Sequence, residues 1–298
     1  MPVTRASPSP PSRPSKRPRV SAASPVALKS PKAKPLAVPR YLTASAPSTA
    51  LARLCDEGYV LLRGVVPAHL CSSAAAAIQT DLGARLDAGS THQQEPIRML
   101  KPATQRAMRA VVSAVLDGAF KRILGMRDAC VPASWDDTLY GRLKRSHFHT
   151  PAHADAFNTI FERKLLARLT PQQHPAWARF LNSGSLDAHW STLPIWTFWV
   201  ALSPVTSAKT SHLRVEPGSH ALPGIRLVNG SAVQPAGYKY RRDCMRGPAF
   251  ASPNQDGGYA PGDVVVFHCL TQHEANAQTG NVDGERVSLD GRVFARLI

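Results

Sequence analysis

The stretch PGDVVVFHCLTQH, from Pro261 to His273, is the part of the sequence that most strongly indicates the fold. A Pro-Gly-Asp turn leads into Val264 to His268, a run of β-branched and aromatic residues that is typical of a buried strand. We place His273 just beyond the end of this strand. It is the first candidate metal ligand, because a histidine held at a strand end can be presented to a cavity.

Strand patterns separated by Gly, Pro and Asn turns continue around this stretch, from about residue 138 onward. We predict strands over 139–143, 195–202, 213–215, 264–268 and 287–298, with one helical piece over about 155–169. Ahead of them, apolar spacing predicts helices over 48–57, 68–88 and 103–124, and a strand over 59–66. Helices followed by many strands predict an α+β chain with a mainly β core, arranged as an antiparallel sandwich or barrel.

His153 is the only one of the eleven histidines that is followed two residues later by a carboxylate, that of Asp155. Side chains at i and i+2 of an extended segment point to the same side, so this pair can grip one ion. The pair alone is a weak signal and needs a third ligand. His273 would complete a two-histidine, one-carboxylate face that leaves about three octahedral positions open for a co-substrate and dioxygen.

Arg286 lies thirteen residues beyond His273, at the start of the last predicted strand, and Ser288 follows it. A guanidinium facing the same cavity would hold a dicarboxylate by paired hydrogen bonds, which an ammonium does less well.

Five segments, in this order, resemble the phytanoyl-CoA dioxygenase family of iron(II)- and 2-oxoglutarate-dependent oxygenases. They are TPAHADAF (150–157), FWVAL (198–202), VEPGSH (215–220), PGDVVVFHCLTQH (261–273) and RVSLDGR (286–292). The segment GYVLLRGVVPAHL (58–70) also resembles the family's first strand and helix. The resemblance therefore covers about residues 51–298.

This resemblance implies a double-stranded β-helix, or jelly-roll, core with flanking N-terminal helices. It implies Fe(II) held by His153, Asp155 and His273. It also implies 2-oxoglutarate paired to Arg286, with Trp199 and Ser288 beside this co-substrate. The activity it implies is an O2-dependent hydroxylation of a C–H bond in a small or lipid-like organic substrate, coupled to conversion of 2-oxoglutarate to succinate.

A second register of the same resemblance stays open, because 43 residues separate Asp155 from Trp199, more than the family usually has. In that register LDAHWS (186–191) is the ligand strand, His189 is the first ligand and Ser191 replaces the carboxylate. Iron would then be weakly held, open to a halide, or absent. We favour His153, because Thr150 and Pro151 match the family's lead-in and Asp155 supplies a charge.

Residues 1–40 differ in composition from the rest of the chain. They hold nine of the 36 Lys and Arg residues and no Asp or Glu, together with ten Pro and seven Ser. Such a segment cannot bury enough apolar surface to offset ordering entropy, so we predict a disordered tail and one oxygenase domain over 41–298. The cluster from Lys16 to Val20 resembles a nuclear-import signal, although organelle transit peptides are also Arg-rich and poor in acids.

Composition also limits the protein's class and location. No apolar run approaches the roughly 20 residues of a membrane-spanning helix. Five cysteines without CxxC spacing argue against a disulfide framework and a cysteine zinc site, which favours an intracellular protein of the nucleus or cytoplasm. Two alternatives to an active oxygenase remain: an inactive family member, and a protein that binds nucleic acid through its basic tail.

Overall fold

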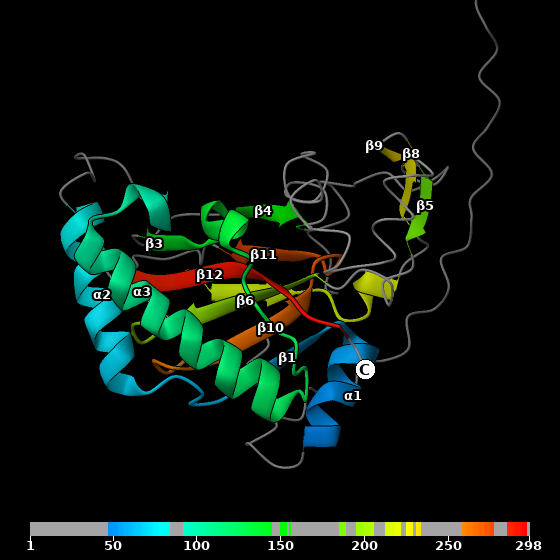
Figure 1. The fold of residues 1–298 in the computed structure, drawn as a ribbon, viewed down its shortest axis with the longest axis horizontal. Helices are drawn as coiled ribbons and strands as arrows, with labels where there is room; N and C mark the ends of the chain where they lie inside the picture. Colours follow the sequence, from blue (N-terminus) through cyan, green and yellow to red (C-terminus); the bar gives the residue numbers. More distant parts are fainter. Residues whose placement is uncertain are drawn as a thin grey trace, which may run out of the picture. The chain divides into compact units, whose positions relative to one another are not determined.

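A six-stranded sheet forms the centre of the computed structural model (Figure 1). Six antiparallel strands lie in the order β1-β10-β6-β12-β3-β2. In that order their bounds are Tyr59–Leu62, Val264–His268, Ile195–Ala201, Arg286–Phe294, Tyr140–Lys144 and His92–Pro96. In β12, Val287, Leu289 and Val293 join the outer apolar core. The two-residue period of a strand therefore turns Arg286, Ser288, Asp290 and Arg292 to the inner face.

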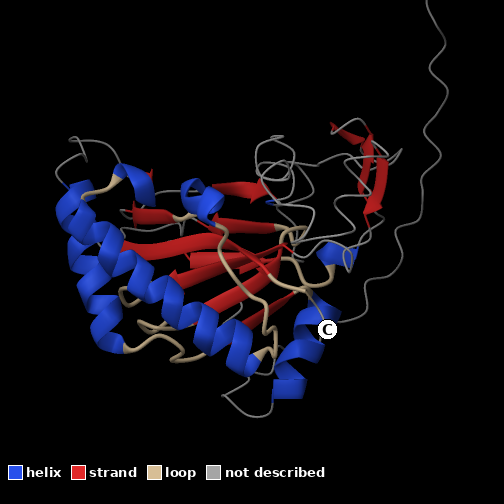
Figure 2. Ribbon diagram, viewed as in Figure 1, coloured by secondary structure: helices blue, strands red, loops and turns tan. Residues whose placement is uncertain are grey.

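Helices cover the outer face of this sheet (Figure 2). They are α1 (Pro47–Glu57), α2 (Ala68–Gly83) and α3 (Pro102–Val115), which continues into the π-helix η2 (Leu116–Ile123). The short 3-10 helices η1 (Ile97–Met99), η3 (Ala133–Thr138) and η7 (Ser219–Ala221) occur in the connections. In α3, Thr104, Met108, Val111, Val112 and Val115 are buried, which places one stripe of the helix against the sheet.

A second sheet faces the inner side of the six strands. It has the order β4-β11-β7, with bounds Thr150–His153, His273–Asn276 and His212–Val215, and its strands are antiparallel. Leu213 and Val215 of β7 pack in one apolar cluster with Trp199 and Phe267 from the large sheet. A third sheet, β5-β8-β9, contains Ser185–Ala188, Ile225–Val228 and Ser231–Val233.

The Pro-Gly-Asp turn holds β10 in place. Gly262 has φ 94°, and a Cβ on it would lie 2.2 Å from the carbonyl oxygen of Val66, so only glycine fits there. The buried carboxylate of Asp263 accepts hydrogen bonds from the backbone N–H of Gly64 and Ala260, and from Arg63. This network fastens the loop after β1 to the start of β10, which makes the two strands neighbours.

The structure describes residues 47–83, 92–144, 150–153, 155, 185–188, 195–205, 212–221, 225–228, 231–233, 258–276 and 285–296. The predicted tail (1–40), nearly all of the predicted helix over 155–169, and His189 lie outside these residues. Residues 39–298 form a compact unit by themselves. Within the described part of the chain, no helix combines the length and apolar character needed to cross a membrane.

The predicted mixture of leading helices and a mainly antiparallel β core is confirmed. Several element bounds were wrong. The strand over 59–66 ends at Leu62, because Gly64 turns the chain with φ 59°. The helix over 103–124 is α-helical only to Val115 and then becomes π-helical. The strand predicted over 287–298 starts at Arg286 and ends at Phe294, and the strand over 139–143 is shifted by one residue.

Several strands were not predicted. His273 follows β10, as predicted, and it is also the first residue of one of the additional strands, β11. The strands without a predicted counterpart are β2, β8, β9 and β11, while β4 and β5 overlap the two candidate ligand segments, 150–157 and 186–191. The predicted strands β1, β3, β7 and β10 also have five residues or fewer, so length alone does not explain which strands were missed. Strand β2, with sequence HQQEP, pairs only with β3 at the sheet edge, so it needs no apolar face.

Candidate metal and co-substrate site

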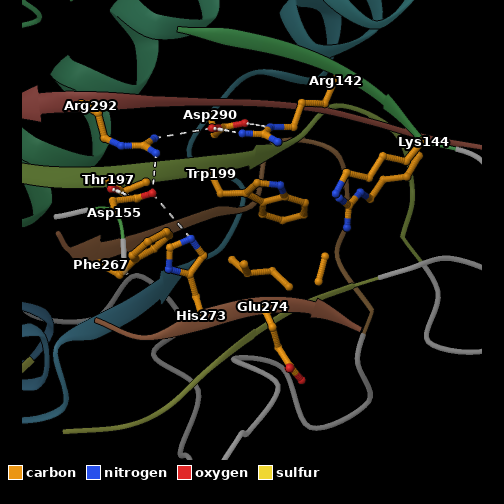
Figure 3. A pocket seen from close by; sticks show the side chains of 13 residues that line it. Arg142, Lys144, Asp155, Thr197, Trp199, Phe267, His273, Glu274, Asp290 and Arg292 are labelled. Atoms are coloured by element: carbon orange, nitrogen blue, oxygen red, sulfur yellow. Dashed lines mark hydrogen bonds and ion pairs between the residues drawn. The ribbon is translucent and has the colours of Figure 1, made fainter. Parts of the chain in front are cut away.

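A cavity lies between the inner face of the six-stranded sheet and the sheet β4-β11-β7 (Figure 3). Eight of its thirteen lining residues are charged or histidine, an unusual composition for the inside of a β sandwich. The lining residues are Arg142, Lys144, Asp155, Thr197, Trp199, Leu213, Phe267, His273, Glu274, Ala275, Arg286, Asp290 and Arg292. Buried charge of this density is stable only where each group is compensated, which points to a functional site.

His273 is held rigidly by the turn that precedes it. The Thr271 hydroxyl donates a hydrogen bond of 2.7 Å to the carbonyl oxygen of Gly58, which ties the turn to the start of β1. The carbonyl oxygen of Thr271 lies 3.1 Å from His273 Nδ1. Because a carbonyl only accepts, Nδ1 carries a proton, so the neutral form of the ring has its lone pair at Nε2, the atom that faces Asp155.

Asp155 is buried, with 2% of its surface exposed, and it faces this imidazole. Its Oδ1 lies 3.8 Å from His273 Nε2. Arg292 Nη2 donates to the same oxygen at 2.6 Å, and the Thr197 hydroxyl donates to Oδ2 at 2.6 Å. Both oxygens of the carboxylate are therefore fixed, and one of them is presented to the histidine (Figure 3).

His153 lies on the strand next to His273. The two residues are Cα partners in the antiparallel pairing of β4 with β11, and Asp155 follows two positions later. The backbone thus brings the three predicted ligand positions together, while the His153 side chain lies outside the described residues. Among the described side chains, no group of three or more His, Cys, Asp or Glu forms a metal cluster. The ligand segment of the second register, 186–191, overlaps β5. This strand pairs with β8 in the third sheet.

The predicted co-substrate residues lie on neighbouring strands of the large sheet. Arg286 and Ser288 are buried on β12 and Trp199 is buried on β6. The guanidinium carbon of Arg286 lies 5.6 Å from the centre of the Trp199 ring, a cation–π contact. Ser288 is opposite Ala201, and its Oγ has no hydrogen-bond partner among the described residues. Ser288 does not itself line the cavity.

The positive groups in the cavity repel one another. The pKa of Arg286 is lowered to about 10, chiefly by burial and also by the neighbouring charge of Arg142. Burial also lowers the pKa of Lys144 well below its usual value, and Arg286 and Arg142 add to this shift. A bound anion would stabilise the charged forms of both groups, so this end of the cavity is suited to an anionic ligand.

Sequence reasoning gave no role to Arg142, Lys144, Thr197, Asp290 or Arg292, all of which line the cavity. A signal was present for two of them. Asp290 and Arg292 follow Arg286 at even spacing on one strand, so they share its face. Arg142 and Lys144 also alternate on β3. Without the pairing of β3 with β12, nothing in the sequence shows that these two rows meet.

No family model matches the chain, and no curated protein matches it. Among solved structures, it is similar to the non-heme alpha ketoglutarate dependent epimerase SnoN from nogalamycin biosynthesis. The two share 17% sequence identity, with 84% of this chain and 83% of SnoN covered and a TM-score of 0.52. This chain has the fold of SnoN.

SnoN has also been solved in complex with Fe3+, alpha ketoglutarate and nogalamycin RO. That structure again gives 17% identity and a TM-score of 0.52, covering 84% of this chain and 86% of SnoN. A further similar structure is EctD from S. alaskensis with 2-oxoglutarate and 5-hydroxyectoine. It has 19% identity, coverage of 85% of this chain and 78% of EctD, and a TM-score of 0.48.

Proposed function

We propose that this protein is an iron(II)- and 2-oxoglutarate-dependent dioxygenase, similar to phytanoyl-CoA dioxygenases and built on a double-stranded β-helix core. The proposal depends on one observation. His273 Nε2 and Asp155 Oδ1 face each other at 3.8 Å in a buried cavity, with His153 opposite His273 in the strand register. The reaction is hydroxylation of a C–H bond in a small or lipid-like organic substrate.

The donor atoms fit Fe(II), which would be held by His153, Asp155 and His273. Two imidazoles and one carboxylate form the facial set of non-haem iron oxygenases. Two ligand atoms that are each about 2.1 Å from one ion and at right angles to each other lie about 3 Å apart. His273 Nε2 and Asp155 Oδ1, at 3.8 Å, would therefore have to move closer together when the metal binds. The Thr271 carbonyl supports the assignment, because metal-binding histidines generally donate their second ring N–H to such a group.

The anionic co-substrate fits the cationic end of the cavity. Arg286 would pair with the distal carboxylate of 2-oxoglutarate through two parallel hydrogen bonds, and Lys144 would add a second positive charge. Trp199, already in contact with the guanidinium, would lie against the carbon chain. Ser288 is two residues along the same strand face, but it does not line the cavity, so we assign it no contact with the ligand.

With bound iron(II), the 2-oxoglutarate and dioxygen supply the oxidising power for breaking the C–H bond. The protein's own contribution is orientation and exclusion of water. Thr197 and Arg292 hold the Asp155 carboxylate in one orientation, and Thr271 holds the His273 ring. Asp155 and His273 are 2% and 7% exposed, so the reacting centre is largely protected from solvent.

The test is an anaerobic calorimetric titration with Fe(II) and then 2-oxoglutarate, followed by a metabolite screen for substrate-stimulated succinate release. We expect Asp155→Ala to reduce iron affinity and succinate formation by more than about 100-fold, beyond the loss typical of outer-shell partners. Asp128→Ala is the matched control, because Asp128 pairs with Arg296 away from the cavity.

The possible results separate the alternatives. Absence of iron binding by the wild-type protein would exclude the metal site, and unchanged succinate formation by Asp155→Ala would place the site elsewhere. Iron and 2-oxoglutarate binding without turnover of any tested metabolite, and without slow uncoupled succinate formation, would instead favour the inactive family member.

A further inference from the structure

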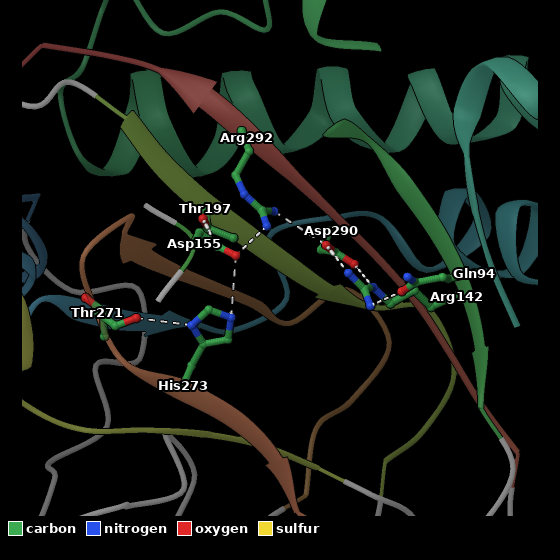
Figure 4. Close-up of polar contacts among 8 residues, drawn as sticks. All are labelled: Gln94, Arg142, Asp155, Thr197, Thr271, His273, Asp290 and Arg292. Carbon is green, nitrogen blue, oxygen red and sulfur yellow. Dashed lines mark hydrogen bonds and ion pairs between the residues drawn. The ribbon is translucent and has the colours of Figure 1, made fainter. Parts of the chain in front are cut away.

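A row of alternating charges crosses the wall of the cavity and ends at Asp155 (Figure 4). It begins at the sheet edge with Gln94 on β2, continues through Arg142 on β3, and reaches Asp290 and Arg292 on β12. We call these four residues together with Asp155 the charge row. Four of its five members are charged, and the sign alternates from each charge to the next.

Each step of the charge row is a direct contact. Arg142 donates to both oxygens of Asp290, through Nε to Oδ1 and through Nη2 to Oδ2, and its Nη1 donates to Gln94 Oε1. Arg292 Nη1 lies 3.5 Å from Asp290 Oδ2, and Arg292 Nη2 donates to Asp155 Oδ1 at 2.6 Å. One guanidinium therefore bridges two buried carboxylates.

Strand register explains why these residues meet. Arg142 is directly opposite Ser288 on β12, so Asp290 is its diagonal neighbour, within reach of a long side chain. Asp290 and Arg292 share one face of β12 at i and i+2. The row is thus built into two paired strands, and Asp155, 137 positions from Arg292 in sequence, is placed against its end.

The contact between Arg292 and Asp155 is important because both groups are buried. Asp155 is 2% exposed and Arg292 is 7% exposed, so neither charge is solvated by bulk water. Removing one partner from a buried, hydrogen-bonded pair leaves the other charge uncompensated. Arg292 fixes Oδ1 while Thr197 fixes Oδ2, and together they determine the plane of the carboxylate.

We propose that Arg292 is a positioning residue for the metal site: it holds the Asp155 carboxylate in the orientation that presents Oδ1 to His273 before the metal binds. This inference rests on the proposed function, since it needs Asp155 to be a metal ligand. Outer-shell partners of this kind typically contribute 10–100-fold to metal affinity. If Arg292 acted only through its positive charge, its removal would change metal affinity in the opposite direction. Taking a cation away from a metal site would tighten the binding of a divalent ion.

The experiment is titration of the full-length, metal-free protein with Co(II) alone, followed by calorimetry and by visible absorption, which reports the coordination of Co(II). The variants are Arg292→Met, which keeps an unbranched apolar stem but removes the guanidinium, and Arg292→Lys, which keeps the charge. Arg296→Met is the matched control. Arg296 also pairs with an aspartate, Asp128, but this pair is exposed and lies beyond the end of β12.

We expect Arg292→Met to weaken Co(II) binding by about 10–100-fold and to change the absorption bands. Arg292→Lys should recover part of the affinity, and Arg296→Met should bind like the wild type. Thr197→Val removes the hydrogen bond at the other carboxylate oxygen with little change in shape, and it should also weaken Co(II) binding. A merely structural role for Arg292 would lower stability without changing the bands of the folded, metal-bound protein.

Two negative results are distinguishable. If Arg292→Met binds Co(II) as tightly as the wild type or more tightly, the positioning role is overturned and the metal site stands. If the wild type does not bind Co(II), the proposed function fails and this inference fails with it. Should Arg292→Met not fold, the Arg292→Lys titration decides: weaker binding than the wild type supports the role, and equal binding overturns it.

Discussion

At the scale of single residues, Asp290 illustrates how a buried carboxylate is kept charged. Burial raises its pKa, but the charge and hydrogen bonds of Arg142, with a further contribution from Arg292, lower the pKa more, so the net shift is downward. An acid whose pKa is lower in the folded than in the unfolded state stabilises the fold at pH values above the unfolded pKa, about 3.9 for Asp. This contribution is lost as the pH falls through the folded pKa.

We predict that Asp290→Asn lowers the free energy of unfolding by about 3–5 kcal/mol near neutral pH, because the buried guanidinium of Arg292 and the half-buried one of Arg142 lose their shared counter-charge. The difference between variant and wild type should remain constant from pH 7 to about pH 5 and should narrow below about pH 4. Urea unfolding at several pH values measures both effects.

The control for this substitution is Asp117→Asn. Asp117 pairs with Lys121 on an exposed helical surface, where an ion pair contributes little. This variant should stay within about 0.5 kcal/mol of the wild type. A stability gap for Asp290→Asn that persists unchanged to pH 2 would contradict the ionised state assigned to Asp290.

At the scale of elements, the connection from β10 to β11 depends on Gly58, the residue before β1. The carbonyl oxygen of Gly58 accepts hydrogen bonds from the backbone N–H of His268 and from the Thr271 hydroxyl. Gly58 has φ 78°, and a Cβ on it would lie 2.3 Å from His220 Nδ1. Both its conformation and its surroundings therefore require glycine, and the position of His273 depends on this contact.

We predict that Gly58→Ala destabilises the protein by about 1–3 kcal/mol more than Gly64→Ala. Gly64 also has a positive φ, 59°, but a Cβ there would meet nothing within 4 Å. Both variants bear the left-handed backbone strain, of about 1–2 kcal/mol. Only Gly58→Ala also has to displace His220. Chemical denaturation measures the difference, and equal losses in the two variants would contradict the packing argument.

At the scale of the whole molecule, the described fold is a layer of helices on one face of a six-stranded sheet and a smaller sheet on the other. The apolar side chains that point outward from β6, β10 and β12 belong to the core shared with the helices. The side chains that point inward form a second cluster and the cavity. One face of these strands therefore packs in the core under the helices, and the opposite face lines the cavity.

We predict that deleting residues 1–40 changes the thermal unfolding midpoint and the Fe(II) affinity little, because residues 39–298 form a unit by themselves. If the tail binds nucleic acid, deletion should also remove the salt-dependent part of binding to a random DNA duplex, measured by fluorescence anisotropy from 50 to 200 mM salt.

A full-length variant with Lys16, Arg17 and Arg19 replaced by glutamine is the matched control, and it should show a reduced dependence of affinity on salt. Equal DNA affinity and salt dependence with and without residues 1–40 would eliminate the nucleic-acid role of the tail. A large fall in the unfolding midpoint would instead contradict the domain boundary.

The sequence alone determined the features that depend on neighbouring residues. Helical spacing of apolar residues predicted the three leading helices. Runs of β-branched and aromatic residues between turn residues predicted the strands β1, β3, β6, β7, β10 and β12. The order of the motifs along the chain identified His153, Asp155 and His273 as candidate metal ligands and Arg286 as a candidate co-substrate residue. The ligand roles of His153, Asp155 and His273 and the co-substrate roles of Arg286, Trp199 and Ser288 remain predictions.

Only the tertiary structure decided which distant groups face one another. Asp155 and His273 come within 3.8 Å because β4 pairs with β11, and Arg142 reaches Asp290 because β3 pairs with β12. Such pairings depend on register between strands that are far apart in the chain, and a shift of one residue would turn every side chain to the opposite face. Local patterns carry no information about that register, so the compensation of buried charges becomes visible only when the strands are paired.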